Sequence, residues 1–148
     1  MKYLSVFFIL TLIVGCKTYN EEDKKSFDEQ IKSYLAKKNI KCQKTSSGLY
    51  YKIIEPGEGE LIKFTDVVSF TYKGYFMNGT VFDEQSKKPV EFEVGQLIGA
   101  WKEMMLLLKP GGKAFLVAPP SLGYGDRDLE DIPPHSILVF EMEVVSVK

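Results

Sequence analysis

The stretch QLIGAWKEMMLLLKPGG, residues 96–112, decides the fold class because it predicts a short helix with very little polar surface. Its apolar residues recur at helical spacing on one face: Trp101, Met104, Met105 and Leu108. Pro110 and the two glycines after it end the helix, since proline cannot continue the hydrogen-bond pattern. A helix this apolar is expected to be almost fully enclosed by the rest of its domain.

The segments on either side of this helix have the patterns of antiparallel strands. Apolar and polar side chains alternate in DVVSFTYKGYF, residues 66–76, and Asn78-Gly79 then predicts a tight hairpin. We expect further strands at residues 48–55, 80–84, 90–94, 113–118 and 136–147. In the last of these, four residues should face inward: Leu138, Phe140, Met142 and Val144. One helix enclosed among antiparallel strands is an α+β arrangement.

The N-terminus has the features of an export signal. A short positive start precedes apolar residues 3–14, which form a stretch of signal-peptide length but are too short to span a bilayer comfortably. It ends in IVGC, which resembles a bacterial lipobox with Cys16 as the acylated residue. We therefore expect a lipoprotein signal peptide at residues 1–15 and a lipid anchor in the outer membrane of the cell envelope. The alternative is an ordinary signal peptide in which the cysteine occurs by chance.

Residues 16–45 are expected to link the anchor to the domain at 46–148. The polar segment 17–25 has the composition of a flexible tether. Ser26 and Glu29 fit a capping box for a helix over 26–38, which could pack on the domain or pair with another copy. If Cys16 carries lipid, Cys42 has no partner and is a free thiol or a small buried group. An internal disulfide is the alternative.

Composition argues against several functional classes. The net charge of -1 provides no basic field for nucleic acid. The single histidine and two cysteines make a zinc site improbable, and we find neither a phosphate-binding loop nor a nucleophile elbow. We accordingly expect no metal and no cofactor. What remains is a set of aromatic residues expected to face inward: Tyr72, Phe82, Phe92, Trp101, Tyr124 and Phe140.

Five sequence blocks carry a resemblance to a known family. These blocks are FTYKG, GTVFDE, VGQLIGAW, LGYGD and IPPHSILVFEMEV, at residues 70–74, 79–84, 94–101, 122–126 and 132–144. Their order and approximate spacing resemble those of FKBP-type peptidyl-prolyl cis/trans isomerases, across residues 46–148. The resemblance implies an antiparallel sheet wrapped around one short helix. It also implies rotation of X-Pro bonds in exported polypeptides, or alternatively binding of prolyl or hydrophobic segments with little turnover.

The resemblance also implies a pocket. Tyr72, Asp83 and Tyr124 would act in catalysis, and the substrate would be bound by Phe82, Val90, Leu97, Ile98, Trp101, Ile132 and Phe140. Trp101 would form the floor, and the two prolines after Ile132 would fix a loop that overhangs the pocket. The sequence departs from the family at Val90, where an aromatic residue is usual. It also lacks the arginine that often pairs with the pocket aspartate, for which Lys87 or Lys88 is a poorer substitute.

Overall fold

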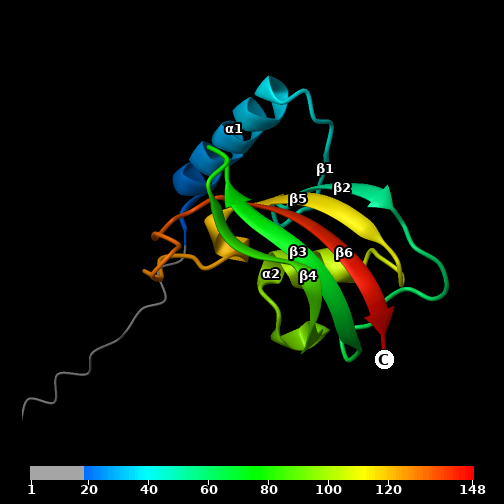
Figure 1. The fold of residues 1–148 in the computed structure, drawn as a ribbon. Coiled ribbons are helices and arrows are strands. Elements are labelled where there is room, and N and C mark those ends of the chain that lie inside the picture. Colours follow the sequence, from blue (N-terminus) through cyan, green and yellow to red (C-terminus); the bar gives the residue numbers. More distant parts are fainter. Residues whose placement is uncertain (1–18) are drawn as a thin grey trace, which may run out of the picture.

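The computed structural model describes residues 19–148, which form one sheet and two α-helices (Figure 1). In chain order the elements are α1 (Glu21–Lys37), β1 (Gln43–Lys44), β2 (Tyr50–Glu55), β3 (Val67–Phe76), β4 (Val81–Glu93), η1 (Val94–Gln96), α2 (Gly99–Met105), β5 (Lys113–Ala118), η2 (Pro120–Leu122) and β6 (Leu138–Val147). All strand pairs are antiparallel, in the order β1-β2-β5-β6-β3-β4. The predicted α+β class, with a sheet curved around a short helix, is confirmed.

Helix α2 lies against the inner face of the sheet, where it forms the main core of the domain. The four apolar residues predicted on its buried side are all at most 8% exposed. They pack with inward residues of β3, β5 and β6, among them Phe70, Leu116 and Phe140. The predicted inward positions of β6 are also buried. Burial of this apolar area is the main driving force for the curved sheet to close on the helix.

Strand β4 is one continuous strand, whereas the sequence predicted two short ones. Phe70 pairs with Val90 and Tyr72 pairs with Gln85, so the extra residues of β4 form a wide irregularity in the ladder. The segment includes Pro89, which cannot donate a ladder hydrogen bond. Strand β4 is an edge of the sheet, where the amide can face solvent, and this is why proline is tolerated here.

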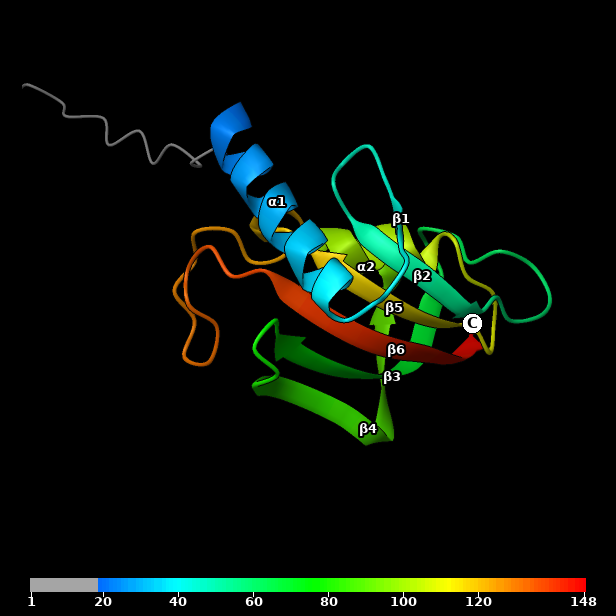
Figure 2. The ribbon, with the colours of Figure 1, turned by 90° about the horizontal axis from the view of Figure 1, so that it is seen from above.

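Helix α1 packs on the outer face of the same sheet, as the first of the two interpretations of this helix predicted (Figure 2). Ile31 and Leu35 are buried against Val117 and Val139. The neighbours of these valines along the strands face α2, because successive strand residues point to opposite faces. The sheet is therefore covered on both faces in this region.

The start of α1 differs from the prediction. The helix begins at Glu21, so residues 21–25 belong to the helix and not to a flexible tether. Asn20 is the capping residue: its Oδ1 accepts from the Asp23 amide at 2.8 Å, and its own amide donates to Asp23 Oδ2 at 3.3 Å. Ser26 and Glu29 have the same spacing but lie inside the helix. The capping box is formed by Asn20 and Asp23, which satisfy the first amides of a longer helix than predicted.

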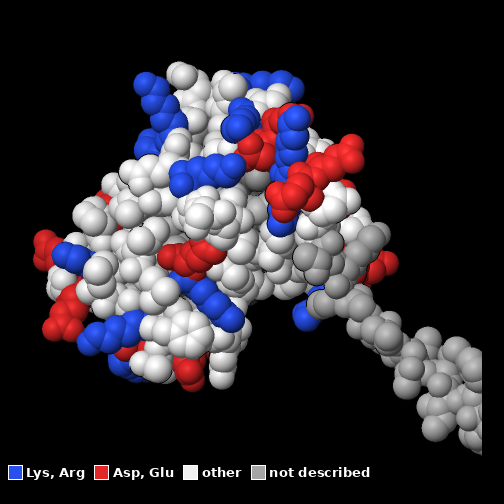
Figure 3. All heavy atoms as spheres, turned by 180° about the vertical axis from the view of Figure 1, so that it is seen from behind, with Lys and Arg blue, Asp and Glu red and all other residues white. Residues whose placement is uncertain are grey.

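A carboxylate ties α1 to the sheet. Asp28 accepts the Tyr50 hydroxyl at 2.6 Å and lies 2.5 Å from Lys44 Nζ and 2.7 Å from Lys32 Nζ. Partial burial alone would raise the pKa of this carboxyl, but the bonds from Lys32, Lys44 and Tyr50 outweigh it and hold the pKa well below its usual range. Figure 3 shows side chains of both signs over the region of α1.

Several predictions fall on residues 1–18, outside the described part of the chain. These are the signal peptide, Cys16 and its lipid. Cys42 is a free, half-buried thiol beside the outer core, and burial raises its pKa. Within residues 19–148, neither helix has the length and apolarity required to cross a membrane.

We predict that Ile31→Ala lowers the free energy of unfolding by about 2–5 kcal/mol, because Ile31 is only 1% exposed between α1 and the sheet. Urea denaturation measures this change. Lys38→Ala, at the exposed end of the same helix, is the control and should change stability by less than about 0.5 kcal/mol. Equal stabilities for the two variants would show that α1 is not docked in solution.

Candidate functional site

The indole of Trp101 is the centre of an aromatic cluster on the inner side of the sheet. Its ring centroid lies 4.7 Å from Tyr72, 5.0 Å from Phe140 and 5.2 Å from Phe70, all in edge-to-face geometry. Helix α2 supplies the tryptophan, and strands β3 and β6 supply the other rings. Edge-to-face packing adds to the stability gained from burial alone, so the positions of these rings are well defined.

The cluster continues to β4 through Phe82. Its ring meets Phe140 at 5.7 Å and Phe76 at 5.0 Å between centroids. Gly74 of β3 leaves room for this contact: a Cβ atom there would lie 2.7 Å from Phe82 and 2.9 Å from Phe140. Gly74 therefore has a role at the site that the sequence analysis missed. The available signal was a glycine inside a strand, which often marks a close approach of other groups.

The indole N–H of Trp101 has no hydrogen-bond partner among the described residues, although it is buried. A buried donor without a partner costs about 1–3 kcal/mol. Such a cost is unusual in a core and is better explained at a site where a ligand supplies the acceptor. This feature distinguishes the Trp101 cluster from ordinary core packing.

A hydrogen-bonded pair forms the polar rim of the cluster. The Tyr72 hydroxyl donates to Asp83 Oδ2 at 2.5 Å. Burial, together with this bond to Asp83, raises the pKa of Tyr72. Burial and the charge of Asp83 also raise the pKa of Tyr124. Both phenols therefore stay protonated as donors at neutral pH, and the Tyr124 hydroxyl makes no hydrogen bond to another described residue.

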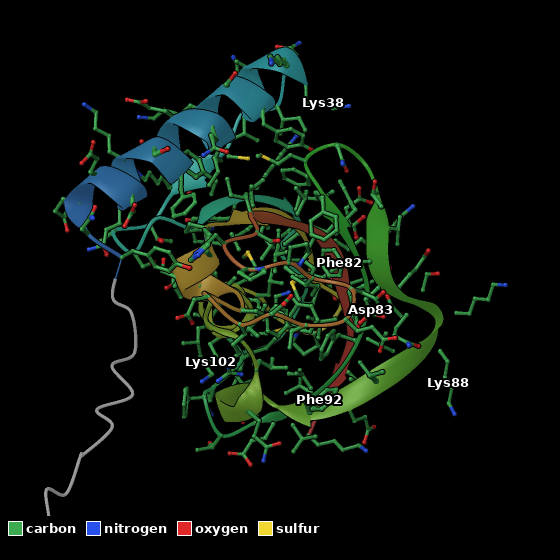
Figure 4. The ribbon with its side chains drawn as sticks, turned by 90° about the vertical axis from the view of Figure 1, so that its left-hand side faces the viewer. Lys38, Phe82, Asp83, Lys88, Phe92 and Lys102 are labelled. Carbon is green, nitrogen blue, oxygen red and sulfur yellow. The ribbon has the colours of Figure 1, made fainter. Side chains whose placement is uncertain are left out.

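No cation neutralises Asp83 within residues 19–148. Among the salt bridges there, none includes this carboxylate. Lys87 and Lys88, the weak substitutes for the missing arginine, are both exposed, and Figure 4 shows Lys88 extending away from the domain. The Tyr72 hydroxyl is thus the partner that orients Asp83.

The loop before β6 places Ile132 in the same core. Ile132 is 7% exposed and packs within the inner cluster. Its amide and carbonyl pair with those of Leu129 at 3.3 and 3.1 Å, which closes the tip of the loop. After the two prolines, the His135 amide donates to Gly125 O at 2.8 Å, with His135 at a φ of 61°. These bonds fix the loop across one side of the aromatic cluster.

The start of α2 supplies an unpaired backbone donor. Ile98 is the N-cap of the helix, and its amide donates to no other described residue. Leu97 is buried, and Ile98 is half-buried beside the core. Val90 is also half-buried, opposite Phe70 on β3.

The structure brings the ten predicted pocket residues to one region. Nine belong to the inner core or pack on it: Tyr72, Phe82, Val90, Leu97, Ile98, Trp101, Tyr124, Ile132 and Phe140. Asp83 joins them through Tyr72. Phe92 faces inward as expected, opposite Val68 on β3 and 6.4 Å from Phe70 between ring centroids. It is nevertheless 45% exposed, because it lies on the edge strand of the sheet.

Comparison with known proteins identifies the family. The model of the FKBP-type peptidyl-prolyl cis-trans isomerases, FKBP_C, matches residues 58–145, which is more than half of the chain. The chain belongs to the FKBP-type peptidyl-prolyl cis-trans isomerase family. Every predicted pocket residue lies inside the matched range, and α1 lies before it.

Relatives of this family resemble the chain over most of its length. A probable FKBP-type isomerase of Haemophilus influenzae is 40% identical over 92% of this chain and 58% of the relative. The crystal structure of FkpA from Escherichia coli superposes with a TM-score of 0.75 at 36% identity, covering 86% of this chain and 62% of that one. An isomerase structure from Pseudomonas syringae pv. tomato gives 0.70 at 26% identity, covering 90% and 99%. The chain spans about half the length of the curated relatives it matches.

Within residues 19–148, no three His, Cys, Asp or Glu side chains gather in a metal-binding group. The site instead offers apolar rings, one carboxylate, two phenols and unpaired N–H donors. It can bind an apolar group and hold carbonyl oxygens by hydrogen bonds.

We predict that Gly74→Ala displaces the Phe82 ring and costs about 1–3 kcal/mol of stability, because the new methyl group overlaps both phenylalanines. The emission of Trp101, the only tryptophan, should shift as the cluster repacks. Gly95→Ala is the matched control: its methyl group would meet Phe64 at 2.9 Å, but that ring is 53% exposed and free to turn away. Identical emission spectra for the two variants would contradict the role assigned to Gly74.

Proposed function

We propose that this domain catalyses cis/trans rotation about X-Pro peptide bonds in polypeptide substrates. The observation that carries the proposal is the buried Trp101 floor, with an unpaired indole N–H and aromatic rings on several sides. Membership of a family described as peptidyl-prolyl cis-trans isomerases supports the same activity. Apolar surroundings with a few placed donors suit a prolyl ring and its flanking carbonyl groups.

The mechanism we propose needs no proton transfer to the substrate and no covalent intermediate. Rotation of a peptide bond has a barrier of about 18–20 kcal/mol, because the planar amide is stabilised by resonance. An acceleration of roughly 10⁵-fold corresponds to about 7 kcal/mol of preference for the transition state. The twisted amide has lost resonance and is less dipolar than the planar one. An apolar aromatic pocket therefore favours the twisted form.

The polar groups around the floor would orient the substrate. In this proposal the free Ile98 amide holds one substrate carbonyl, and the Tyr124 hydroxyl holds another. The carboxylate of Asp83, oriented by the Tyr72 hydroxyl, places a negative charge beside the substrate amide, whose charge distribution changes during rotation. Ile132, buried in the inner core, helps to exclude water from the rotating bond.

Turnover of short X-Pro peptides tests the activity directly. We expect the folded protein to accelerate isomerisation in a protease-coupled assay, most strongly when the residue before proline is apolar. Circular dichroism on the same sample establishes that the protein is folded. A folded protein that binds prolyl peptides without accelerating them would instead be a binding module or chaperone.

Tyr124→Phe tests whether the Tyr124 hydroxyl binds a substrate carbonyl group. The substitution removes one hydroxyl that makes no hydrogen bond to another described residue, so the melting temperature should change little. Activity should fall several-fold, since one hydrogen bond to the substrate contributes about 1 kcal/mol. Trp101→Ala is the contrast and should cost roughly 3–5 kcal/mol of stability, because the indole is only 8% exposed. Loss of stability without loss of turnover in Tyr124→Phe would make Tyr124 a structural residue.

We further propose that the mature chain begins at an acylated Cys16 and acts on exported, proline-containing polypeptides at the outer membrane. The lipobox-like IVGC supports this proposal. Because α1 already begins at Glu21, five peptide steps separate the helix from Cys16. An extended chain of that length reaches about 18 Å, so an anchored domain would be held close to the membrane surface.

Cys16→Ser tests the anchor. The variant should lose incorporation of a fatty-acid probe and leave the membrane fraction, because the thiol is the acylated group. Cys42→Ser is the matched control and should keep both properties. Continued labelling and membrane retention of Cys16→Ser would contradict the lipobox assignment.

A further inference from the structure

A hollow beside the proposed prolyl pocket reaches the N-terminal helix. This lateral groove has a volume of about 550 Å³, and its lining includes Tyr19, Lys24, Gln96, Ile98, Tyr124 and Arg127. Such a volume falls within the range of about 300–1,000 Å³ typical of ligand clefts. Leu97, Ile98 and Tyr124 line this groove and are also assigned to the proposed prolyl pocket, so the groove borders that pocket.

The far wall of the lateral groove is held in place by contacts of Tyr19. The Tyr19 hydroxyl lies 2.9 Å from His135 Nδ1, and the two rings meet edge to face at 5.7 Å. The tyrosine ring also packs edge to face on Phe27 of α1, at 5.4 Å between centroids. Figure 1 shows the start of α1 beside the loop that leads into β6. Tyr19 therefore has a fixed position at the edge of the groove.

The lining of the lateral groove combines apolar and polar groups. Leu97, Ile98 and Tyr124 are largely apolar and belong to the inner core or pack on it. Other lining residues can form hydrogen bonds, among them the Gln96 amide, the Ser121 hydroxyl and the Lys24 amine. Lys24 is paired with Glu21, yet its side chain remains 50% exposed. Dispersed donors and acceptors of this kind suit the main chain of an extended peptide.

We propose that the lateral groove is a subsite for the substrate chain that flanks the proline. This inference rests on the proposed function and specifies its substrate class as extended polypeptide segments that reach α1. The residues shared with the pocket identify the occupant of the groove. A substrate chain whose carbonyl groups bind at Ile98 and Tyr124 continues directly into the groove. The flank is remote from the rotating bond, so it binds the planar and twisted forms equally. Such uniform binding lowers KM without raising kcat.

Paired peptide substrates test the subsite. One substrate is a short X-Pro peptide, and the others carry six additional residues on one side or the other of the proline. For the unmodified protein, KM should be lower for one of the extended peptides, with the same kcat. Tyr19→Ala and Lys24→Ala should each reduce the preference for that peptide, measured as the ratio of kcat/KM values, by about fivefold, roughly the effect of one lost hydrogen bond.

Lys38→Ala, at the opposite end of α1, should keep the preference and is the matched control (Figure 4). Equal KM values for short and extended peptides with the unmodified protein would overturn the proposal. It would also be overturned if Tyr19→Ala lowered kcat equally for all peptides, because Tyr19 would then act only by holding the His135 loop. If Tyr19→Ala does not fold, Lys24→Ala at its exposed position provides the test: an unchanged preference for the extended peptide would overturn the proposal.

Failure of the isomerase proposal can be distinguished from failure of the subsite proposal. In that case no peptide is turned over, and binding of fluorescently labelled peptides is measured instead. Tighter binding of an extended peptide, weakened in both groove variants, would keep the subsite while the isomerase proposal fails. Equal binding of short and extended peptides would reject the subsite as well.

Discussion

Enclosure of α2 by the curved sheet is the constraint on which the rest of the structure depends. The helix is seven residues long, too short to be stable alone, so its conformation depends on burial of its apolar side chains. Trp101 is the largest of these and contacts rings from β3 and β6. The same packing that stabilises the fold therefore also builds the floor of the candidate site.

The candidate site combines tightly packed aromatic rings with N–H groups that have no hydrogen-bond partner. Aromatic rings fix the indole from several sides, yet its N–H and the Ile98 amide have no partner among the described residues. Strand β4 adds Asp83 at the rim, where Tyr72 orients it in place of a cation. The buried Trp101 N–H has an energetic cost that the packing around it must offset, as is common at functional sites.

Helix α1 gives the domain a second core on the opposite face of the sheet. Ile31 and Leu35 cover Val117 and Val139, while Asp28 ties the helix to Tyr50 and Lys44. This docking also determines where the chain enters the domain, which places Tyr19 on His135 beside the pocket loop. A helix outside the matched family region thus becomes part of the surroundings of the candidate site.

The sequence by itself determined the elements whose cause is local. The apolar helix at α2, the Asn78-Gly79 hairpin and the alternation in β3 and β6 follow from spacing and turn chemistry. The motif blocks contain nine of the ten predicted pocket residues, all except Val90. Tertiary structure decided the rest. The continuous β4 depends on pairing with β3, and the partial exposure of Phe92 follows from its place on the edge strand. The need for glycine at Gly74 arises from Phe82 and Phe140, which lie 8 and 66 residues further along the chain. The contact of Tyr19 with His135 spans 116 residues. Such contacts leave no periodic signal, because they form only when distant segments are packed together.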